Sequence, residues 1–300
     1  MGGAQEQQAS ETGLQQQLRI AEEAFELRLG PDLYVRGEVR LVPEQRQKPV
    51  LVIVHGFKGF KDWGFNPYVA TRFAQQGYAV VVFNFSCNGV HKTDFDELEK
   101  FAVNTYSREQ ADLQELMKHV TERTLPLGGL FDTERIALLG HSRGGANSII
   151  HAAANPSIRA VVTWNSIADC NLFDEAFRQE VLSAGVGYVP NARTKQQMPI
   201  RAEFFEDLDV NKERYDIPAV LAGLSVPVLL LQGDQDSERL VKGNARLREA
   251  APQHTYITIE GGSHTFGAVH PFAGTTAQLE EAVRLTEQFV QKHVSGMELP

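Results

Sequence analysis

The strongest candidate for chemistry is a serine between glycines, Ser142 in the run Gly140–Gly144 (GHSRG). This G-x-S-x-G pattern follows a short apolar run and opens a stretch of small residues, which predicts a tight strand-to-helix turn. The flanking glycines permit the close backbone approach that such a turn needs. The helix N-terminus behind the serine offers free N–H groups to a developing negative charge. We therefore predict that Ser142 is a nucleophile rather than a structural turn residue.

A serine hydroxyl needs a base to take its proton and an acid to orient that base. Among nine histidines, His264 is the best placed, because it stands in a glycine-rich loop directly after the last predicted strand. His270, further along, could line the site. The acid is expected after the preceding strand, where Asp234 and Asp236 both stand. We predict that Asp236 is the acid and that Asp234 binds backbone N–H groups of its loop, although the sequence leaves open whether Asp234 could replace it.

A second glycine-flanked turn, His55–Gly59 (HGFKG), follows the first continuously apolar run. It can aim the backbone N–H of Phe57 at the oxyanion of a substrate, and the N–H of Arg143 would be the second donor. Because these donors are backbone groups, the Arg143 side chain is expected to be exposed and structural. Lys58 and Lys61 could attract an acidic substrate, but a solvated loop face is the expected place for them.

Apolar runs predict the strands that position these residues. Two alternating runs, 25–29 and 35–41, predict an antiparallel pair at the start of the ordered chain. Continuous apolar runs, typical of strands buried on both faces of a parallel sheet, occur at 50–54, 79–83, 136–139, 160–163, 228–231 and 256–259. Helical patterns occur at 107–124, with a capping box from Ser107 to Gln110, and at 144–155, 238–251 and 277–294. This alternation predicts an α/β fold with a mostly parallel eight-stranded sheet flanked by helices.

One interval breaks the alternation. Residues 169–223 are rich in aromatic side chains but show no clean strand–helix unit, and a connection of this length normally has structure or function of its own. We predict an inserted cap or lid there, with residues 18–168 and 224–300 forming the core. An ordinary helix followed by an irregular connection is the alternative. Residues 1–17 are polar and glutamine-rich, which predicts a disordered tail.

At four motifs the chain resembles the α/β-hydrolase family, and the resemblance covers roughly residues 25–295. The motifs are HGF at 55–57, GHSRG at 140–144, GDQD at 233–236 and GSH at 262–264. The chain looks most like bacterial feruloyl and cinnamoyl esterases and the serine aminopeptidase-like branch. The resemblance implies Ser142 as nucleophile, His264 as base, Asp236 as acid, and Phe57 and Arg143 as oxyanion donors.

The chain also departs from its apparent relatives. Residues 84–89 (NFSCNG) stand where many relatives carry an Arg-x-Asp-rich loop, so contacts there do not transfer. A haloalkane dehalogenase of this fold would need aspartate at position 142, and a dienelactone hydrolase would usually carry cysteine there.

We expect a carboxylesterase that works through an acyl-enzyme on a small to medium or aromatic ester. A thioesterase or a serine aminopeptidase on the same triad is the alternative. The peptidase needs acidic groups for the substrate ammonium, and Glu203, Glu206, Asp207 and Asp209 could supply them. A non-catalytic binding protein on a hydrolase fold is the third hypothesis.

Composition narrows the expected partners. The net charge of −9 disfavours binding to nucleic acid and to anionic membranes. The sequence contains no metal-binding motif and no dinucleotide fingerprint, so neither metal nor cofactor is expected. Cys87 and Cys170 are expected to be small buried hydrophobic residues. The absence of a signal segment and of a membrane span favours a cytoplasmic location. The expected partner is a small-molecule ester, and the oligomeric state stays open.

Overall fold

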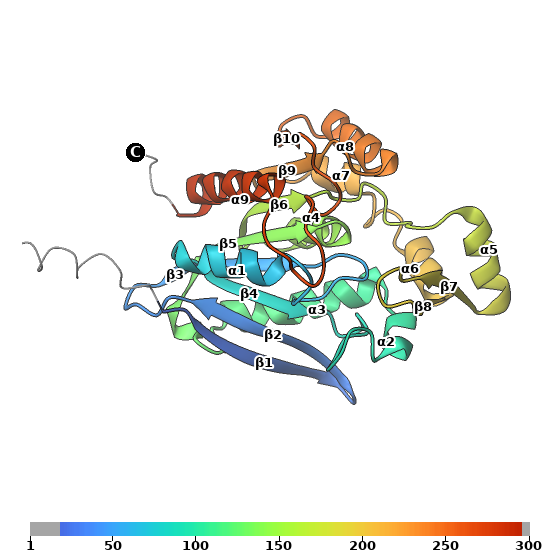
Figure 1. Ribbon diagram of the computed structural model, residues 1–300, viewed down its shortest axis with the longest axis horizontal. Coiled ribbons are helices and arrows are strands. Elements are labelled where there is room, and N and C mark those ends of the chain that lie inside the picture. Colours follow the sequence, from blue (N-terminus) through green and yellow to red (C-terminus); the bar gives the residue numbers. More distant parts are fainter. Residues whose placement is uncertain (1–18, 296–300) are drawn as a thin grey trace, which may run out of the picture.

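The computed structural model describes residues 19–295, and its centre is an eight-stranded sheet with the order β1-β2-β4-β3-β5-β6-β9-β10 (Figure 1). Its strands are β1 (Ala21–Gly30), β2 (Leu33–Leu41), β3 (Lys48–Val54), β4 (Ala79–Asn84), β5 (Phe131–His141), β6 (Ile158–Trp164), β9 (Val228–Gly233) and β10 (Thr255–Ile259). Strand β2 runs antiparallel to both of its neighbours, and the other pairings are parallel. The predicted sheet is confirmed, whereas the predicted tail at residues 1–17 lies outside the described residues.

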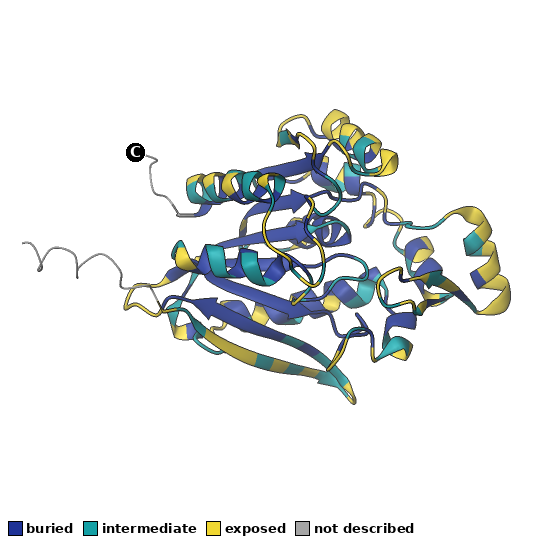
Figure 2. Ribbon diagram, in the orientation of Figure 1, coloured by how far each residue is buried: buried dark blue, intermediate teal, exposed yellow. Residues whose placement is uncertain are grey.

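The central strands are buried on both faces, as their continuous apolar runs predict. All seven residues of β3 are buried, and successive side chains point to opposite faces of the sheet. Two core clusters result, one containing Val52 and the other Leu51. Helices α3 (Tyr106–Thr121), α4 (Arg143–Ala154) and α8 (Glu238–Ala250) pack on the first cluster, and α1 (Asn66–Gln75) and α9 (Ala277–Val290) pack on the second. Figure 2 shows the buried sheet between these layers.

The start of α3 differs from the prediction. Thr105, not Ser107, caps the helix, because its side chain accepts a hydrogen bond from the Arg108 N–H. Ser107 lies inside the first turn, where its N–H donates to Asp207 at 3.0 Å and its hydroxyl contacts the same carboxylate. Ser107, which the local pattern assigned to the cap, therefore contacts Asp207, a hundred residues away in the sequence.

The segment between β6 and β9 has secondary structure of its own. It contains α5 (Glu175–Ala184), β7 (Val186–Pro190), β8 (Gln197–Arg201), α6 (Glu203–Val210) and α7 (Ile217–Ala222). Strands β7 and β8 form a separate antiparallel pair. Figure 1 shows α5, α6 and this pair together at one end of the molecule. The function of this segment as a lid stays a prediction.

Shorter elements complete the described chain. They are α2 (Leu98–Ala102), the 3₁₀ turn η1 (Gly128–Leu130) and the π-helical turn η2 (Gln291–Ser295). Cys87 and Cys170 are both free and buried, as predicted. Within residues 19–295, no helix has the length and apolar character needed to cross a membrane.

A buried histidine on α4 predicts how stability depends on pH. His151 is 2% exposed, and burial, with a smaller contribution from Arg214, lowers its pKa from 6.5 to about 4. Between these two values the unfolded chain binds a proton that the folded chain does not. The free energy of unfolding should therefore fall as the pH drops through this window, by up to about 1.4 kcal/mol per pH unit from this group.

Urea unfolding at several pH values between 7 and 4 tests this expectation. The His151→Leu variant should show a smaller loss of unfolding free energy on acidification than the wild type, because leucine does not titrate. Equal losses in the two proteins would contradict the assignment.

Candidate active site

Ser142 occupies a strained turn between β5 and α4. Its backbone angles, φ 57° and ψ −120°, lie where residues with a side chain are rarely found. The glycines on either side are required by close packing. A Cβ at Gly140 would lie 2.2 Å from the carbonyl oxygen of Gly144, and a Cβ at Gly144 would lie 2.1 Å from that of Val54. The predicted strand-to-helix turn is therefore observed, pressed against the end of β3.

The structure brings together the three side chains that the sequence singled out. His264 Nε2 lies 3.1 Å from Ser142 Oγ, and His264 Nδ1 lies 2.9 Å from Asp236 Oδ2. The Asp236 side chain is only 2% exposed, and it also accepts hydrogen bonds from the Ser237 N–H at 2.7 Å and from Gln232 Nε2 at 3.2 Å. Burial by itself would raise the pKa of Asp236, but these hydrogen bonds, led by His264, hold it below its usual value. Asp236 is therefore ionised at neutral pH.

Asp234 lies in the same loop but makes a different contact. Its Oδ1 accepts the Gly261 N–H at 2.8 Å, which is the loop-binding contact predicted for it. Of the two carboxylates that the sequence offered, Asp236 is the one hydrogen-bonded to His264.

The two predicted oxyanion donors flank the serine. Gly56 packs so tightly on the turn of Ser142 that a Cβ there would lie 2.9 Å from the His141 carbonyl oxygen and 3.0 Å from Ser142 Cβ. This approach places the turn that carries Phe57 beside Ser142. Arg143 is the first residue of α4, so its N–H has no acceptor within the helix. Both N–H groups stay predicted donors.

The Arg143 side chain corrects the sequence prediction, because it is 1% exposed rather than solvated. Its Nε donates to Glu109 Oε2 at 2.8 Å, and its guanidinium lies 4.0 Å from the centre of the Tyr106 ring. Glu109 also accepts from Asn104 at 2.8 Å and from Asn147 at 2.6 Å. Burial by itself would lower the pKa of Arg143, but Glu109 raises it, so the guanidinium stays charged. A buried ionic network thus underlies the first turn of α4.

Sequence reasoning missed Asn165, a fully buried residue directly after β6. Its Nδ2 donates to the carbonyl oxygens of Ser263 at 3.2 Å and His264 at 2.9 Å, and its Oδ1 accepts the Gly233 N–H at 2.7 Å. Asn165 therefore ties the loop of His264 to the end of β9. The only sequence signal was its position at the carboxyl end of a predicted buried strand.

His141, the residue before Ser142, supports the same loop. Its Nε2 lies 2.8 Å from the His264 carbonyl oxygen. Burial, with the nearby His264, lowers the pKa of His141 to about 3, so the ring is neutral at neutral pH. Because the partner is a carbonyl oxygen, the neutral ring carries its proton on Nε2.

A cleft of about 300 Å³ opens at Ser142 and His264. Its wall contains the aromatic rings of Phe57, Trp63 and Phe65. The segment between β6 and β9 contributes residues 191–193. The aromatic residues of that segment are not in this wall. Four of them, Phe173, Phe177, Phe204 and Phe205, pack on one another instead, with ring centres 4.8 Å apart for Phe173 and Phe177.

The two lysines near the turn of Phe57 are partly buried, and each has a partner. Lys58 lines the cleft and its Nζ donates to the Pro190 carbonyl oxygen at 3.0 Å. Burial lowers the pKa of Lys58. Lys61 pairs with Glu38 at 3.0 Å and with Asp62 at 2.7 Å. Both side chains are partly buried and have partners, so the expected loop face is only partly solvated.

The acidic group proposed for a peptidase does not line the cleft. Asp207 binds the start of α3, and Asp209 pairs with Arg178 at 2.6 Å. Glu203 and Glu206 are exposed on α6. Within residues 19–295, no group of three or more histidine, cysteine or acidic side chains is placed to hold a metal ion.

Comparisons with known proteins agree with this architecture. A model of the dienelactone hydrolase family matches residues 29–182, just over half of the chain. The structure of DcsB in complex with its substrate analogue is 16% identical, with 91% of this chain and 100% of that chain covered and a TM-score of 0.71. Dienelactone hydrolase from Anabaena variabilis is 16% identical, with 92% and 99% covered and a TM-score of 0.61. Est1E from Butyrivibrio proteoclasticus is 15% identical, with 91% and 99% covered and a TM-score of 0.64.

Identities this low establish a common fold and nothing finer. No curated relative matches the sequence. The family match includes position 142, where this chain has serine. The absence of cysteine at position 142 was therefore wrong as a ground for setting the chain apart from this family, because the family model matches across the serine.

Proposed function

The chain belongs to the dienelactone hydrolase family, and we propose that it hydrolyses carboxylic esters with Ser142 as its nucleophile. The observation that carries this proposal is the hydrogen-bonded line from Asp236 through His264 to Ser142, with distances of 2.9 and 3.1 Å, at the wall of a cleft. A serine so placed can lose its proton to histidine as it attacks, which a serine without a base cannot do.

The proposed reaction has two halves. Ser142 Oγ attacks the ester carbonyl carbon while its proton passes to His264 Nε2, and the carbonyl oxygen becomes an oxyanion that accepts from the N–H groups of Phe57 and Arg143. When the intermediate collapses, the bond to the alcohol breaks and His264 protonates the leaving oxygen. Water then attacks the acyl-enzyme, gives its proton to His264 and releases the carboxylic acid as Ser142 is reprotonated.

The cleft supports a substrate of small to medium size. Its volume of about 300 Å³ is at the lower end of the range found for ligand pockets. The rings of Phe57, Trp63 and Phe65 offer apolar contact to a short acyl chain or an aromatic ring.

Hydrolysis of p-nitrophenyl esters from acetate to decanoate tests the proposal, with wild type beside Ser142→Ala. We expect activity that peaks at short chains and is lost in the variant, together with labelling of the wild type alone by a fluorophosphonate probe. Labelling without ester turnover would contradict the ester assignment and point to a thioester or a peptide bond. Neither labelling nor turnover would point to a non-catalytic binding protein.

A further inference from the structure

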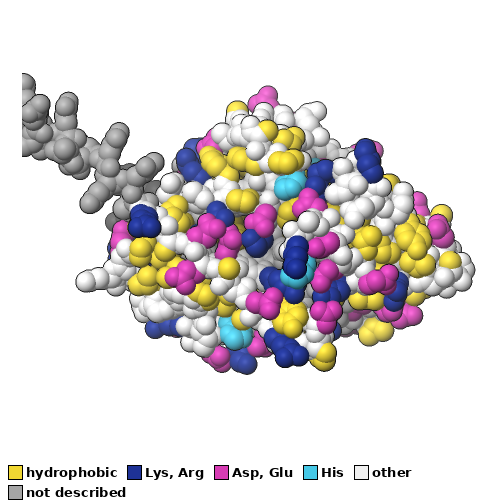
Figure 3. All heavy atoms as spheres, turned by 60° about the horizontal axis from the view of Figure 1, so that its bottom comes forward, with side chains coloured by type: hydrophobic (Ala, Val, Ile, Leu, Met, Phe, Trp, Pro, Cys, Tyr) yellow, Lys and Arg dark blue, Asp and Glu magenta, His cyan; other side chains and the backbone are white. Residues whose placement is uncertain are grey.

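A small group of side chains separates the cleft at Ser142 from a second hollow on the neighbouring surface. The hollow has a volume of about 540 Å³ and lies between the β1–β2 hairpin and the loop after β4. His270 lines both spaces, Arg193 lines the cleft, and Asp94 lines the hollow. We call these three residues the partition. Figure 3 shows acidic, basic and histidine side chains close together near the middle of the face that it draws.

The partition is held by its own contacts. Arg193 Nη1 forms an ion pair with Asp94 Oδ2, and His270 Nε2 lies 3.5 Å from the same oxygen. His270 Nδ1 accepts the Gly64 N–H at 2.8 Å, so the neutral ring carries its proton on Nε2, toward Asp94. Burial, and then the nearby Arg193, lowers the pKa of His270. Arg193 is therefore the charged partner of Asp94.

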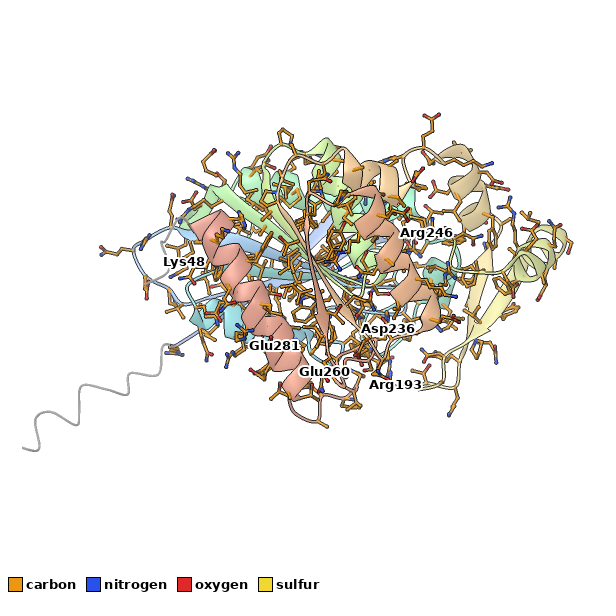
Figure 4. The ribbon with its side chains drawn as sticks, turned by 90° about the horizontal axis from the view of Figure 1, so that it is seen from above. Lys48, Arg193, Asp236, Arg246, Glu260 and Glu281 are labelled. Carbon is orange, nitrogen blue, oxygen red and sulfur yellow. The ribbon has the colours of Figure 1, made fainter. Side chains whose placement is uncertain are left out.

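Arg193 belongs to the segment between β6 and β9, in the loop that joins β7 to β8. Figure 4 shows it at the tip of that loop, on the side facing the core. The loop is fixed at both ends, because the Pro190 carbonyl oxygen accepts from Lys58 Nζ and Gln196 Nε2 donates to the Phe95 carbonyl oxygen, each at 3.0 Å. These two hydrogen bonds hold the loop on both sides of Arg193, so that its side chain lines the cleft.

We propose that the partition sets the upper length of the substrate, and that Arg193 is the residue that limits it. The inference rests on the proposed ester hydrolysis and names the specificity of the same site. With the Arg193 side chain in place, a substrate chain meets the ion pair with Asp94. Without it, the chain can extend past His270 into the hollow. Phe25, Phe60 and Val90 offer apolar contact there beside polar and charged side chains, and each further CH₂ that they remove from water favours binding.

Two readouts test the proposal in wild type, Arg193→Ala and a control. The first is kcat/KM for p-nitrophenyl acetate and decanoate. The second is the affinity of Ser142→Ala protein for butyramide and octanamide, measured by calorimetry. Because both amides are neutral, the ratio of their affinities does not depend on attraction to the charge of Arg193. We expect Arg193→Ala to raise both long-to-short ratios at least about tenfold, which corresponds to about 1.4 kcal/mol.

Arg201→Ala is the matched control, because Arg201 pairs with Glu99 at 2.6 Å in the same segment but lines neither space. Its ratios should equal those of the wild type. Asp94→Ala, which frees Arg193 while leaving its side chain in place, should raise the ratios less than Arg193→Ala. Unchanged amide affinities in Arg193→Ala overturn the proposal. A wild type that hydrolyses no ester, with amide ratios that still rise, overturns the proposed function and leaves the partition standing.

Discussion

Replacement of Asp236 by asparagine is expected to lower kcat for ester hydrolysis by about 10⁴-fold. The carboxylate accepts a hydrogen bond from His264 Nδ1 at 2.9 Å, which leaves the lone pair of Nε2 directed at Ser142 Oγ. An asparagine NH₂ group at this position would donate to Nδ1, so the proton of the neutral ring would move to Nε2, and the base could no longer take the serine proton. Steady-state hydrolysis of p-nitrophenyl acetate measures the loss.

Asp234→Asn is the matched control for this variant. It changes the other carboxylate of the same loop, which binds the Gly261 N–H rather than His264. An asparagine oxygen can still accept that hydrogen bond, so kcat should stay within a few-fold of the wild type. A large loss in Asp234→Asn with little loss in Asp236→Asn would reverse the assignment of the acid.

Replacement of Glu109 by alanine is expected to lower the free energy of unfolding by about 3–5 kcal/mol. Glu109 is 3% exposed and is the ionic partner of Arg143, which is 1% exposed. Without the carboxylate, a buried guanidinium loses its counter-charge, and Asn104 and Asn147 each lose an acceptor. Chemical denaturation monitored by circular dichroism measures the change.

Two further variants distinguish the effect of an unpaired buried charge from the effect of shortening a side chain. Glu134→Ala removes an exposed partner of Arg159, and it should cost no more than about 1 kcal/mol. The double variant Glu109→Leu with Arg143→Met removes both charges, so it should lose less stability than Glu109→Ala. If the double variant were the less stable protein, lost packing rather than the unpaired charge would explain the effect.

The sheet and the three residues of the site could be predicted because their signals are local. The strands at 50–54 and 136–139 are continuous apolar runs, and such runs have few ways to be buried other than inside a parallel sheet. Ser142, Asp236 and His264 each stand within a few residues of the end of such a strand. Parallel strands bring their carboxyl ends to one edge, so the chain order of the motifs was enough to place them together.

What could not be predicted depends on contacts between distant segments. Ser107 has the local pattern of a helix cap, but Asp207 binds it from the segment beyond β6. Arg143 looks like a surface residue until Glu109, 34 positions earlier, is placed beside it. Arg193 and Asp94 are 99 positions apart, and neither has a pattern that marks its partner. Local periodicity carries no information about such pairs.

The connection between β6 and β9 has an evolutionary consequence. These strands are parallel neighbours, with Val161 paired to Val228, so the chain leaves the sheet at the carboxyl end of β6 and must cross back to enter β9 at its amino end. The part of this connection that precedes α7 can be shortened, extended or exchanged while the strand pairing is preserved. Residues 191–193 of this segment stand in the cleft wall, whereas Ser142, Asp236 and His264 stand outside it. Descendants of such a chain can change which substrates they accept while they inherit the proposed reacting groups unchanged.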